Sequence, residues 1–438
     1  MRFPEETCAR ILLAAACFLW SFSNSAAIAG ELASRSFRIP VFFITDRNLQ
    51  PDQSGEIDFG PHRKYIGDCK HDPFMGSAWC VVENFENKPL TDRLKELGWS
   101  EAEPNDKLAS FKATPISADN FDAIEREFYE TVHKRALVTD DKNLLVFAHG
   151  YKNSFRAALS TAAKLAYYAE RPLILYSWPS VAKLRSYTTD ENNVEWSQEH
   201  FNEVIGHLER LCSEDPTVKV RLFAHSMGTR LLVRATPLLS EKHYVLEAAL
   251  ICPDVDDGLV KHYARRYLSV NGTMEIRLYM SQRDKALALS QVVHGGYTRL
   301  GEQADALGGW VANTLSGQKT TAEEEEKKGE DGELADKLSK TKGRMQTIDF
   351  TNIDKGLIGH NVPAKLICNM SFTGTPGPGL ELVQEESGQR SRISNAFTKM
   401  AKLKTSDGST PTGAVLRVVK DTPDNKGHLQ KAAMQPAQ

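Results

Sequence analysis

The sequence has no excess of basic residues and no long apolar run. Its 438 residues include 54 lysines and arginines against 57 aspartates and glutamates, a formal net charge of −3. This balance gives no electrostatic basis for binding nucleic acid or an anionic membrane surface. The N-terminal apolar stretch, residues 11–20, is too short for a good transmembrane helix. We therefore predict no nucleic-acid partner and no stable membrane insertion of the mature protein.

Internal repeats, Cys-x-x-Cys pairs and histidine–cysteine clusters at zinc-ligand spacing are also missing. The sequence thus gives no reason to predict a metal or another cofactor. Of seven cysteines, Cys8 and Cys17 lie in the N-terminal segment, so an odd number remains and at least one thiol is unpaired. In an oxidising compartment Cys69 and Cys80 could form a disulfide. Cys252 lies in an apolar run, which indicates a buried core residue.

Residues 1–29 have the layout of a secretory signal peptide. Arg2 and Arg10 precede the apolar stretch, and small residues lead to Ala27-Ile28-Ala29, a cleavage-site pattern. Cleavage before Gly30 predicts a periplasmic or secreted bacterial protein. An uncleaved membrane anchor is the alternative.

After a first strand at residues 36–45, residues 50–110 are expected to be irregular, apart from a short strand at 79–83. A helix is expected at 120–134, and apolar strands then alternate with amphipathic helices. This alternation predicts an α/β domain over residues 36–370, a mostly parallel sheet with helices on both faces in a three-layer sandwich. The expected strands are 143–148, 173–177, 218–224, 246–252, 274–280 and 346–350, and the expected helices 154–170, 194–212 and 226–239.

Two segments break this pattern. Residues 319–342 are rich in glutamate and lysine and have almost no large apolar side chain. Such a segment cannot bury a core, so we predict a charged, disordered insertion that is partly helical through Glu–Lys pairs four residues apart. Residues 387–438 are polar and poorly periodic, which predicts a poorly structured C-terminal tail.

Residues 224–228, Ala-His-Ser-Met-Gly, lie between the expected strand 218–224 and a helical pattern. A strand that ends in a small-x-Ser-x-small pentapeptide and turns sharply into a helix is the nucleophile elbow of α/β-hydrolases. The turn holds Ser226 at positive φ, lifts its hydroxyl clear of the sheet and requires small residues at positions 224 and 228. Ser226 is therefore the candidate nucleophile for acyl transfer.

An attacking serine needs a base, and an acid that orients the base. In α/β-hydrolases these follow the serine in the order acid, then histidine. Asp284, just beyond the strand 274–280, is the candidate acid, although an aspartate here could simply cap the next helix. Asp254, one strand earlier, is the alternative acid. His360 follows the last expected strand and is the candidate base, with His294 as the alternative.

The oxyanion of a tetrahedral intermediate also needs hydrogen-bond donors. The expected strand 143–148 ends in His149-Gly150, where glycine lets the backbone approach a substrate closely. The backbone N–H groups of Tyr151 and Met227 are therefore the candidate oxyanion donors. We expect His225, beside the serine, to pack beneath the elbow and take no part in catalysis.

Four separated segments form a set in the order 149–155 (His-Gly-Tyr-Lys-Asn-Ser-Phe), 176–180 (Tyr-Ser-Trp-Pro-Ser), 224–228 and 281–287 (Ser-Gln-Arg-Asp-Lys-Ala-Leu). This set resembles the motifs of a bacterial α/β-hydrolase family of uncharacterised esterase- and lipase-like proteins, within the serine hydrolase superfamily. Thr45-Asp46-Arg47 and His294-Gly295-Gly296 are similar to the family's other recurring segments. The resemblance spans residues 38–370 and departs from the family's pattern just after His360.

Together with the candidate triad, the resemblance implies an exported serine hydrolase of carboxylesterase or lipase type. It would cleave a small-molecule or lipid-like ester, or a thioester, through an acyl-enzyme on Ser226. The same residues suit an acyltransferase or a peptidase, because a triad fixes neither the leaving group nor the acceptor. A non-catalytic envelope binding protein that keeps the fold is the alternative from another class.

Overall fold

The structure, a computed structural model, describes residues 36–51, 57–64, 73–104, 106, 109–113, 121–239, 243–256, 258–260, 274–294, 297, 299–302, 345–354, 360–384 and 414–420. The strands are β1 (Ser36–Thr45), β2 (Arg47–Pro51), β3 (Ile57–Arg63), β4 (Phe74–Glu83), β5 (Ser100–Glu101), β6 (Ala109–Ala113), β7 (Asn143–Ala148), β8 (Leu173–Ser177), β9 (Lys219–His225), β10 (Val245–Ile251), β11 (Glu275–Met280), β12 (Met345–Asp349), β13 (Leu380–Gln384) and β14 (Ala414–Lys420). The helices are α2 (Asp92–Glu96), α3 (Phe121–Ala136), α4 (Phe155–Ala169), α5 (Tyr187–Trp196), α6 (Gln198–Glu214), α7 (Thr229–Leu239), α9 (Lys285–Val293) and α12 (Ala364–Thr373), with the short turns η2 (Ser226–Gly228) and η3 (Leu300–Glu302).

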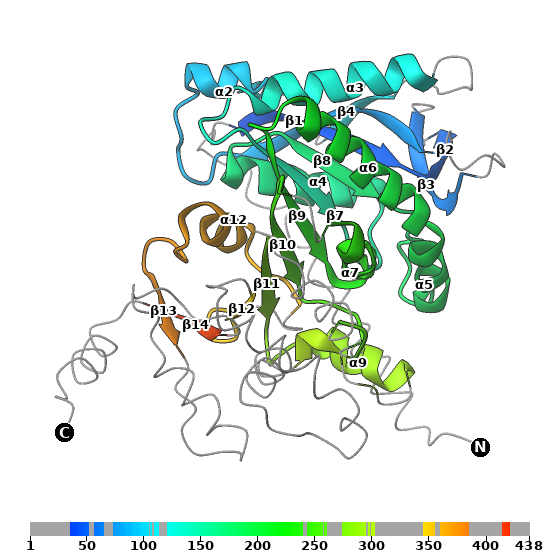
Figure 1. Cartoon of the computed structure of the whole chain (residues 1–438), viewed down its shortest axis with the longest axis vertical. Coiled ribbons are helices and arrows are strands. Elements are labelled where there is room, and N and C mark those ends of the chain that lie inside the picture. Colours follow the sequence, from blue (N-terminus) through cyan, green and yellow to red (C-terminus); the bar gives the residue numbers. More distant parts are fainter. Residues whose placement is uncertain are drawn as a thin grey trace.

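A twelve-stranded, mostly parallel sheet runs through the middle of the molecule (Figure 1). Neighbouring strands are parallel from β14 through β12, β11, β10, β9, β7 and β8 to β1. Antiparallel strands extend the sheet at its ends, β13 beside β14 and β4 and β6 beyond β1. β2 and β3 form a separate two-stranded sheet.

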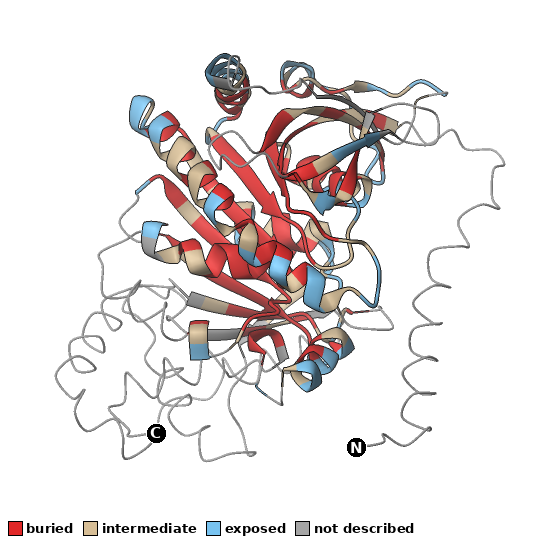
Figure 2. Cartoon of the chain, turned by 90° about the vertical axis from the view of Figure 1, so that its right-hand side faces the viewer, coloured by how far each residue is buried: buried red, intermediate tan, exposed pale blue. Residues whose placement is uncertain are grey.

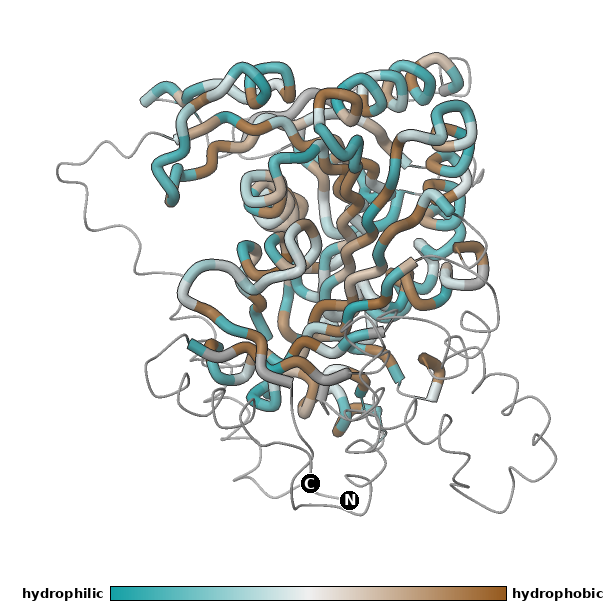
Figure 3. Tube along the Cα trace, turned by 60° about the vertical axis from the view of Figure 1, so that its left-hand side comes forward, coloured by the Kyte–Doolittle hydropathy of each residue, from teal (hydrophilic) through white to brown (hydrophobic). Residues whose placement is uncertain are grey.

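Helices cover both faces of the sheet. Apolar residues of α3, α6 and α7, such as Phe128, Leu208 and Leu231, pack on one face. Those of α2, α4 and α12, such as Leu159 and Ile367, pack on the other. Figure 2 shows the buried strands between helices with exposed outer sides, and Figure 3 shows apolar residues along the central strands. The three-layer α/β architecture predicted from the alternation of strands and helices is thus confirmed.

Three element predictions need correction. The stretch expected to be irregular contains α2, β3, β5, the start of β6 and a ten-residue β4, in which Gly76 and Ser77 interrupt the apolar pattern. The helix expected at 194–212 is two helices, α5 and α6, that meet at Ser197. The start of α5 at Tyr187 was not predicted, because its polar sequence shows no apolar period. The helix expected at 226–239 starts as the short turn η2 before α7.

The predicted C-terminal tail 387–438 also needs correction, because β14 pairs with both β12 and β13. Leu416 and Val418, alternate residues of this strand, are buried, and one short period-two stretch is easily overlooked. The rest of the tail, the predicted signal peptide 1–29 and the predicted insertion 319–342 lie outside the described residues. Among the described residues no helix is long and apolar enough to cross a membrane.

Cys80 is a free thiol, in contrast to the disulfide considered between Cys69 and Cys80. It is 1% exposed on β4, and its Sγ faces the carbonyl of Leu159 on α4 at 3.9 Å. Cys69 lies outside the described residues. The thiol of Cys80 therefore serves as a small core side chain.

A buried arginine holds the loops that follow β7 and β8. Arg47, 1% exposed, donates to the carbonyls of Gly60, Asn153 and Ser180 at 3.3, 2.8 and 2.9 Å. Its Nη2 also lies 3.2 Å from Nε2 of His149, whose Nδ1 lies 2.8 Å from the carbonyl of Gly150. A proton on Nδ1 satisfies that carbonyl and leaves Nε2 to accept from Arg47. Burial, with the Arg47 charge adding to it, lowers the pKa of His149 to about 3, so the ring is neutral near neutral pH.

We expect acid to destabilise the fold through His149. Its pKa is about 3 in the folded chain against 6.5 for an ordinary histidine, so between these values the unfolded chain binds a proton that the folded chain does not. The contribution of the neutral ring to the free energy of unfolding is complete above pH 6.5. It is lost by about 1.4 kcal/mol for each unit by which the pH falls toward 3. The free energy of unfolding of His149→Gln, measured with urea at a series of pH values in this range, should therefore depend less steeply on pH, by about 1.4 kcal/mol per pH unit.

The exposed His62→Gln is the matched control for this series. Equal slopes for wild type and His149→Gln would contradict the assignment of a neutral, buried His149.

Candidate active site

The loops after β7, β9, β10, β11 and β12 meet at one edge of the sheet, because these strands run parallel. From β7 the chain crosses to β8 on one side and returns as β9 on the other. Open α/β sheets bind ligands at the carboxyl ends of the strands, where the strand order reverses in this way. The predicted elbow follows β9 and therefore lies at this switch point.

Ser226 has the backbone conformation that the pentapeptide predicts. Its φ is +52°, in the left-handed region that non-glycine residues rarely adopt, and the residue is 5% exposed. The hydroxyl of Thr229 donates to the Ser226 carbonyl at 2.6 Å, and the backbone N–H of Asp254 donates to it at 3.3 Å. The turn is thus fixed from α7 and from the loop after β10.

Two glycines let the loops after β7 and β9 touch. A Cβ on Gly228 would lie 2.3 Å from the carbonyl oxygen of His149, and a Cβ on Gly150 would lie 2.8 Å from Cβ of Ser226. None of the three atoms nearest to the Gly228 position belongs to Ala224. The need for glycine at position 228 therefore comes from the end of β7, and the sequence argument on positions 224 and 228 missed this neighbour.

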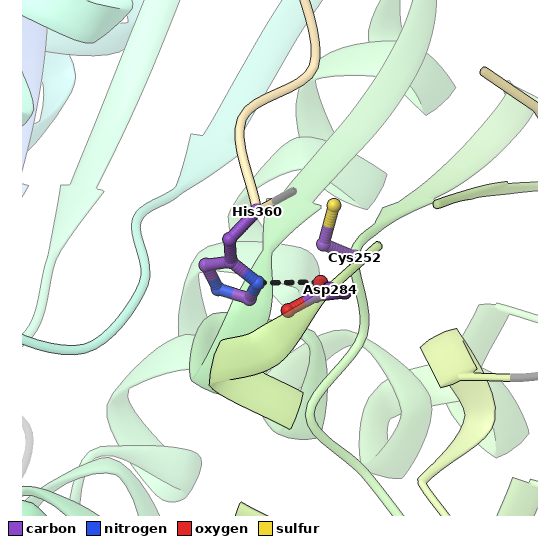
Figure 4. Close-up of side chains that lie close together, drawn as sticks. All are labelled: Cys252, Asp284 and His360. Atoms are coloured by element: carbon purple, nitrogen blue, oxygen red, sulfur yellow. Dashed lines mark hydrogen bonds and ion pairs between the residues drawn. The ribbon is translucent and has the colours of Figure 1, made fainter. Parts of the chain in front are cut away.

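Asp284 contacts both a helix and a histidine. Its Oδ1 accepts from the backbone N–H groups of Ala286 and Leu287 at 3.1 and 3.0 Å, which caps α9. Its Oδ2 lies 2.7 Å from Nδ1 of His360, and the two side chains are 1% and 18% exposed (Figure 4). The cap and the acid–histidine pair therefore use different oxygens of one carboxylate. Among the described residues nothing hydrogen-bonds the other ring nitrogen of His360, Nε2.

His225 fixes the backbone of His360. Its Nε2 donates to the His360 carbonyl at 3.0 Å, and the two rings lie 5.0 Å apart. Desolvation, with the neighbouring His360 ring adding to it, lowers the pKa of His225 to about 3, so the ring stays neutral. Since His225 directly precedes Ser226, this bond joins the elbow to the segment that carries the candidate base. The sequence placed His225 beneath the elbow and did not foresee this contact.

The alternative acid and base belong to another network. Asp254 accepts from the hydroxyls of Ser290 at 2.6 Å and of Tyr187, and it pairs with no histidine among the described residues. The ring nitrogens of His294 lie 2.7 Å from the carbonyl of Ser290 and 2.8 Å from the carboxylate of Glu191. Both nitrogens face acceptors, so neither is placed to take a proton from Ser226. The structure brings Asp284 and His360 together and leaves Asp254 and His294 apart from them.

Arg230 and Glu191 tie α5 to the elbow helix, and sequence reasoning missed both. Arg230, 6% exposed on α7, donates to the Glu191 carboxylate at 2.5 Å and to the Asp254 carbonyl at 3.0 Å. Tyr187, at the start of α5, lies with its ring 5.3 Å from that of Tyr151 in the loop after β7. The sequence points to the buried Arg47 only through the segment Thr45-Asp46-Arg47, because contacts to backbone carbonyls leave no further signal in a sequence.

The two amides singled out as oxyanion donors flank the elbow. Met227 is fully buried in the first turn after β9, where N–H groups have no acceptor within the helix. The N–H of Tyr151 has no acceptor among the described residues, while its side-chain hydroxyl donates to the carbonyl of Lys183 at 3.0 Å.

Residues 124–315 match the model of a protein family described as alpha/beta hydrolase of unknown function (DUF900). The matched segment includes the elbow, Asp284 and the loop after β7, whereas β1 and His360 lie outside it. A search among curated proteins finds no match. The sequence match agrees with the resemblance seen in the separated motifs and with the parallel, helix-covered sheet. Over residues 124–315 the chain is thus similar to an α/β-hydrolase family of unknown function, and the fold agrees with that match.

Proposed function

We propose that the protein is a serine hydrolase that cleaves a carboxylic ester or thioester through an acyl-enzyme on Ser226. The observation that carries the proposal is the 2.7 Å contact between Asp284 and His360, fastened by His225 to the elbow. The serine, the acid and the histidine also follow the chain order of α/β-hydrolases. The family match supports a hydrolase in general and names no substrate.

In the proposed mechanism, Ser226 Oγ attacks the carbonyl carbon of the acyl group and Nε2 of His360 takes the hydroxyl proton. Asp284 accepts from Nδ1–H, which orients the ring and stabilises the imidazolium. The amides of Tyr151 and Met227 donate to the oxyanion. His360 then gives the proton to the leaving alcohol or thiol. Water, activated by the same ring, hydrolyses the acyl-enzyme.

The surroundings of the elbow favour a small or soluble acyl ester over a lipid aggregate. α5, which packs against α7 and η2, has the sequence Tyr-Thr-Thr-Asp-Glu-Asn-Asn-Val-Glu-Trp and presents few apolar side chains. An interfacial lipase needs an apolar cover that can open onto a lipid surface. The proposed location, periplasmic or secreted, rests on the signal-peptide pattern of residues 1–29.

A fluorophosphonate probe, which reacts with activated serines, should label the wild-type protein and fail to label Ser226→Ala. In-gel fluorescence and the mass of the intact protein measure the labelling, and circular dichroism compares folding. Ser290→Ala is the matched control, because Ser290 is another buried serine in contact with an aspartate and a histidine. A folded wild type that takes no label would exclude the serine hydrolase and favour a non-catalytic binding role.

The two candidate acids can be separated on p-nitrophenyl esters. Asp284→Asn should lower kcat by about 10³- to 10⁴-fold with little change in KM, because the ring of His360 loses its orienting carboxylate. Asp254→Asn should stay within about tenfold of wild type, since losing hydrogen bonds to Ser290 and Tyr187 costs about 1–2 kcal/mol. The opposite ranking would identify Asp254 as the acid.

An acyl chain-length series then distinguishes esterase from lipase. Peptide amides and added acyl acceptors test for a peptidase and an acyltransferase.

A further inference from the structure

Cys252 stands beside the Asp284–His360 pair, and no step of the proposed mechanism uses it (Figure 4). The three residues follow β10, β11 and β12, whose carboxyl ends meet at the same edge of the sheet. One ligand atom of each residue lies within 4.8 Å of those of the other two. A sulfur, an oxygen and a nitrogen thus converge from loops far apart in the sequence.

The backbone fixes Cys252 in this position. Its φ is +46°, in the left-handed region, and its N–H donates to the carbonyl of Tyr279 at 2.8 Å. Such a conformation persists only where the surrounding structure enforces it. Burial, with the carboxylates of Asp284 and Asp354 adding to it, raises the pKa of the Cys252 thiol, so the thiol is protonated when no cation is near.

We propose that Cys252, Asp284 and His360 form a binding site for a divalent cation that accepts mixed sulfur, nitrogen and oxygen ligands, above all Zn²⁺. Thiolate, imidazole and carboxylate are the donor types that zinc takes in proteins. Zinc bonds of about 2.0–2.3 Å in a tetrahedron place ligand atoms roughly 3.3–3.6 Å apart. Asp284 Oδ2 and His360 Nδ1 therefore move apart by roughly 0.6–0.9 Å from their 2.7 Å contact. A water molecule takes the fourth position.

Contacts outside the proposed site hold two of the ligands, Asp284 and His360, in place. The other oxygen of Asp284 stays on the amides of Ala286 and Leu287, so the carboxylate keeps its direction while Oδ2 turns to the cation. The His225 bond to the His360 carbonyl likewise keeps the ring near its place. Supporting contacts of this kind orient the ligands of metal sites.

Binding exchanges the thiol proton of Cys252 for the cation and releases that proton to solvent. Nδ1 of His360 binds through its lone pair, so the proton of the neutral ring lies on Nε2. In this form the ring cannot accept a proton from Ser226, and Asp284 no longer orients it. The cation is therefore an inhibitor of the site. This consequence rests on the proposed function, whereas cation binding itself does not.

The full-length protein, stripped of metal with a chelator, is titrated with ZnCl₂ by calorimetry and equilibrium dialysis. Wild type should bind one Zn²⁺ ion, and this binding should depend on Cys252. Removal of a supporting contact lowers metal affinity roughly 10- to 100-fold, and Cys252→Ala should lower the zinc affinity by more than that. Cys212→Ala, which removes another buried free thiol on α6, is the matched control and should bind as wild type does. Circular dichroism checks the fold, and Cys252→Ser replaces the alanine variant if the latter does not fold.

Equal zinc affinity in wild type and the Cys252 variant overturns the proposal, as does a wild type that binds no zinc. Zinc should also protect Ser226 of wild type from the fluorophosphonate probe. In the Cys252 variant, labelling with zinc should equal labelling without zinc. Cysteine-dependent zinc binding by a protein that never takes the probe would refute the serine hydrolase and leave the cation site standing.

Discussion

The candidate site depends on the close contact between the ends of β7 and β9. Gly228 rests directly on the carbonyl oxygens of Ala148 and His149, and Gly150 rests against Ser226. Neighbouring parallel strands already place these ends side by side, and the missing side chains let the following loops stay together. The backbone around Ser226 is therefore set by the sheet, and the side chains that bear chemistry are added to a fixed frame.

Buried polar groups then secure that frame by holding backbone atoms. Arg47 holds carbonyls of β3 and of the loops after β7 and β8, His225 holds the carbonyl of His360, and Asp284 holds two amides at the start of α9. Buried polar groups that are fully hydrogen-bonded rigidify a structure, whereas partly bonded ones destabilise it. His225 can act in this way because burial keeps its ring neutral. The same desolvation that suits a neutral donor would not suit a base.

The sequence predicted those parts that depend on local patterns. Strands β7 and β8 are continuous apolar runs, and the pentapeptide around Ser226 specifies a strained turn by itself, so both could be foreseen. Asp284 and His360 could be placed from chain order. Chain order could not show that one carboxylate both caps α9 and binds the histidine. α5 escaped prediction because its polar sequence has no apolar period, and ion pairs such as Arg230–Glu191, which tie it to α7, leave no such period. Cys252 is the buried core residue that its apolar run predicts. Its neighbours Asp284 and His360 could not be foreseen, because they meet it only through the parallel register of β10, β11 and β12.

The position of β14 affects how the protein can be shortened. This strand lies between β12 and β13, so the last described residues of the chain join the edge strand β13 to the rest of the sheet. A chain that ends after residue 384 would leave β12 with a row of unpaired N–H and C=O groups and β13 without a neighbour. Open edges of this kind pair with other chains and promote aggregation. β14, which supplies none of the candidate site residues, would therefore govern solubility.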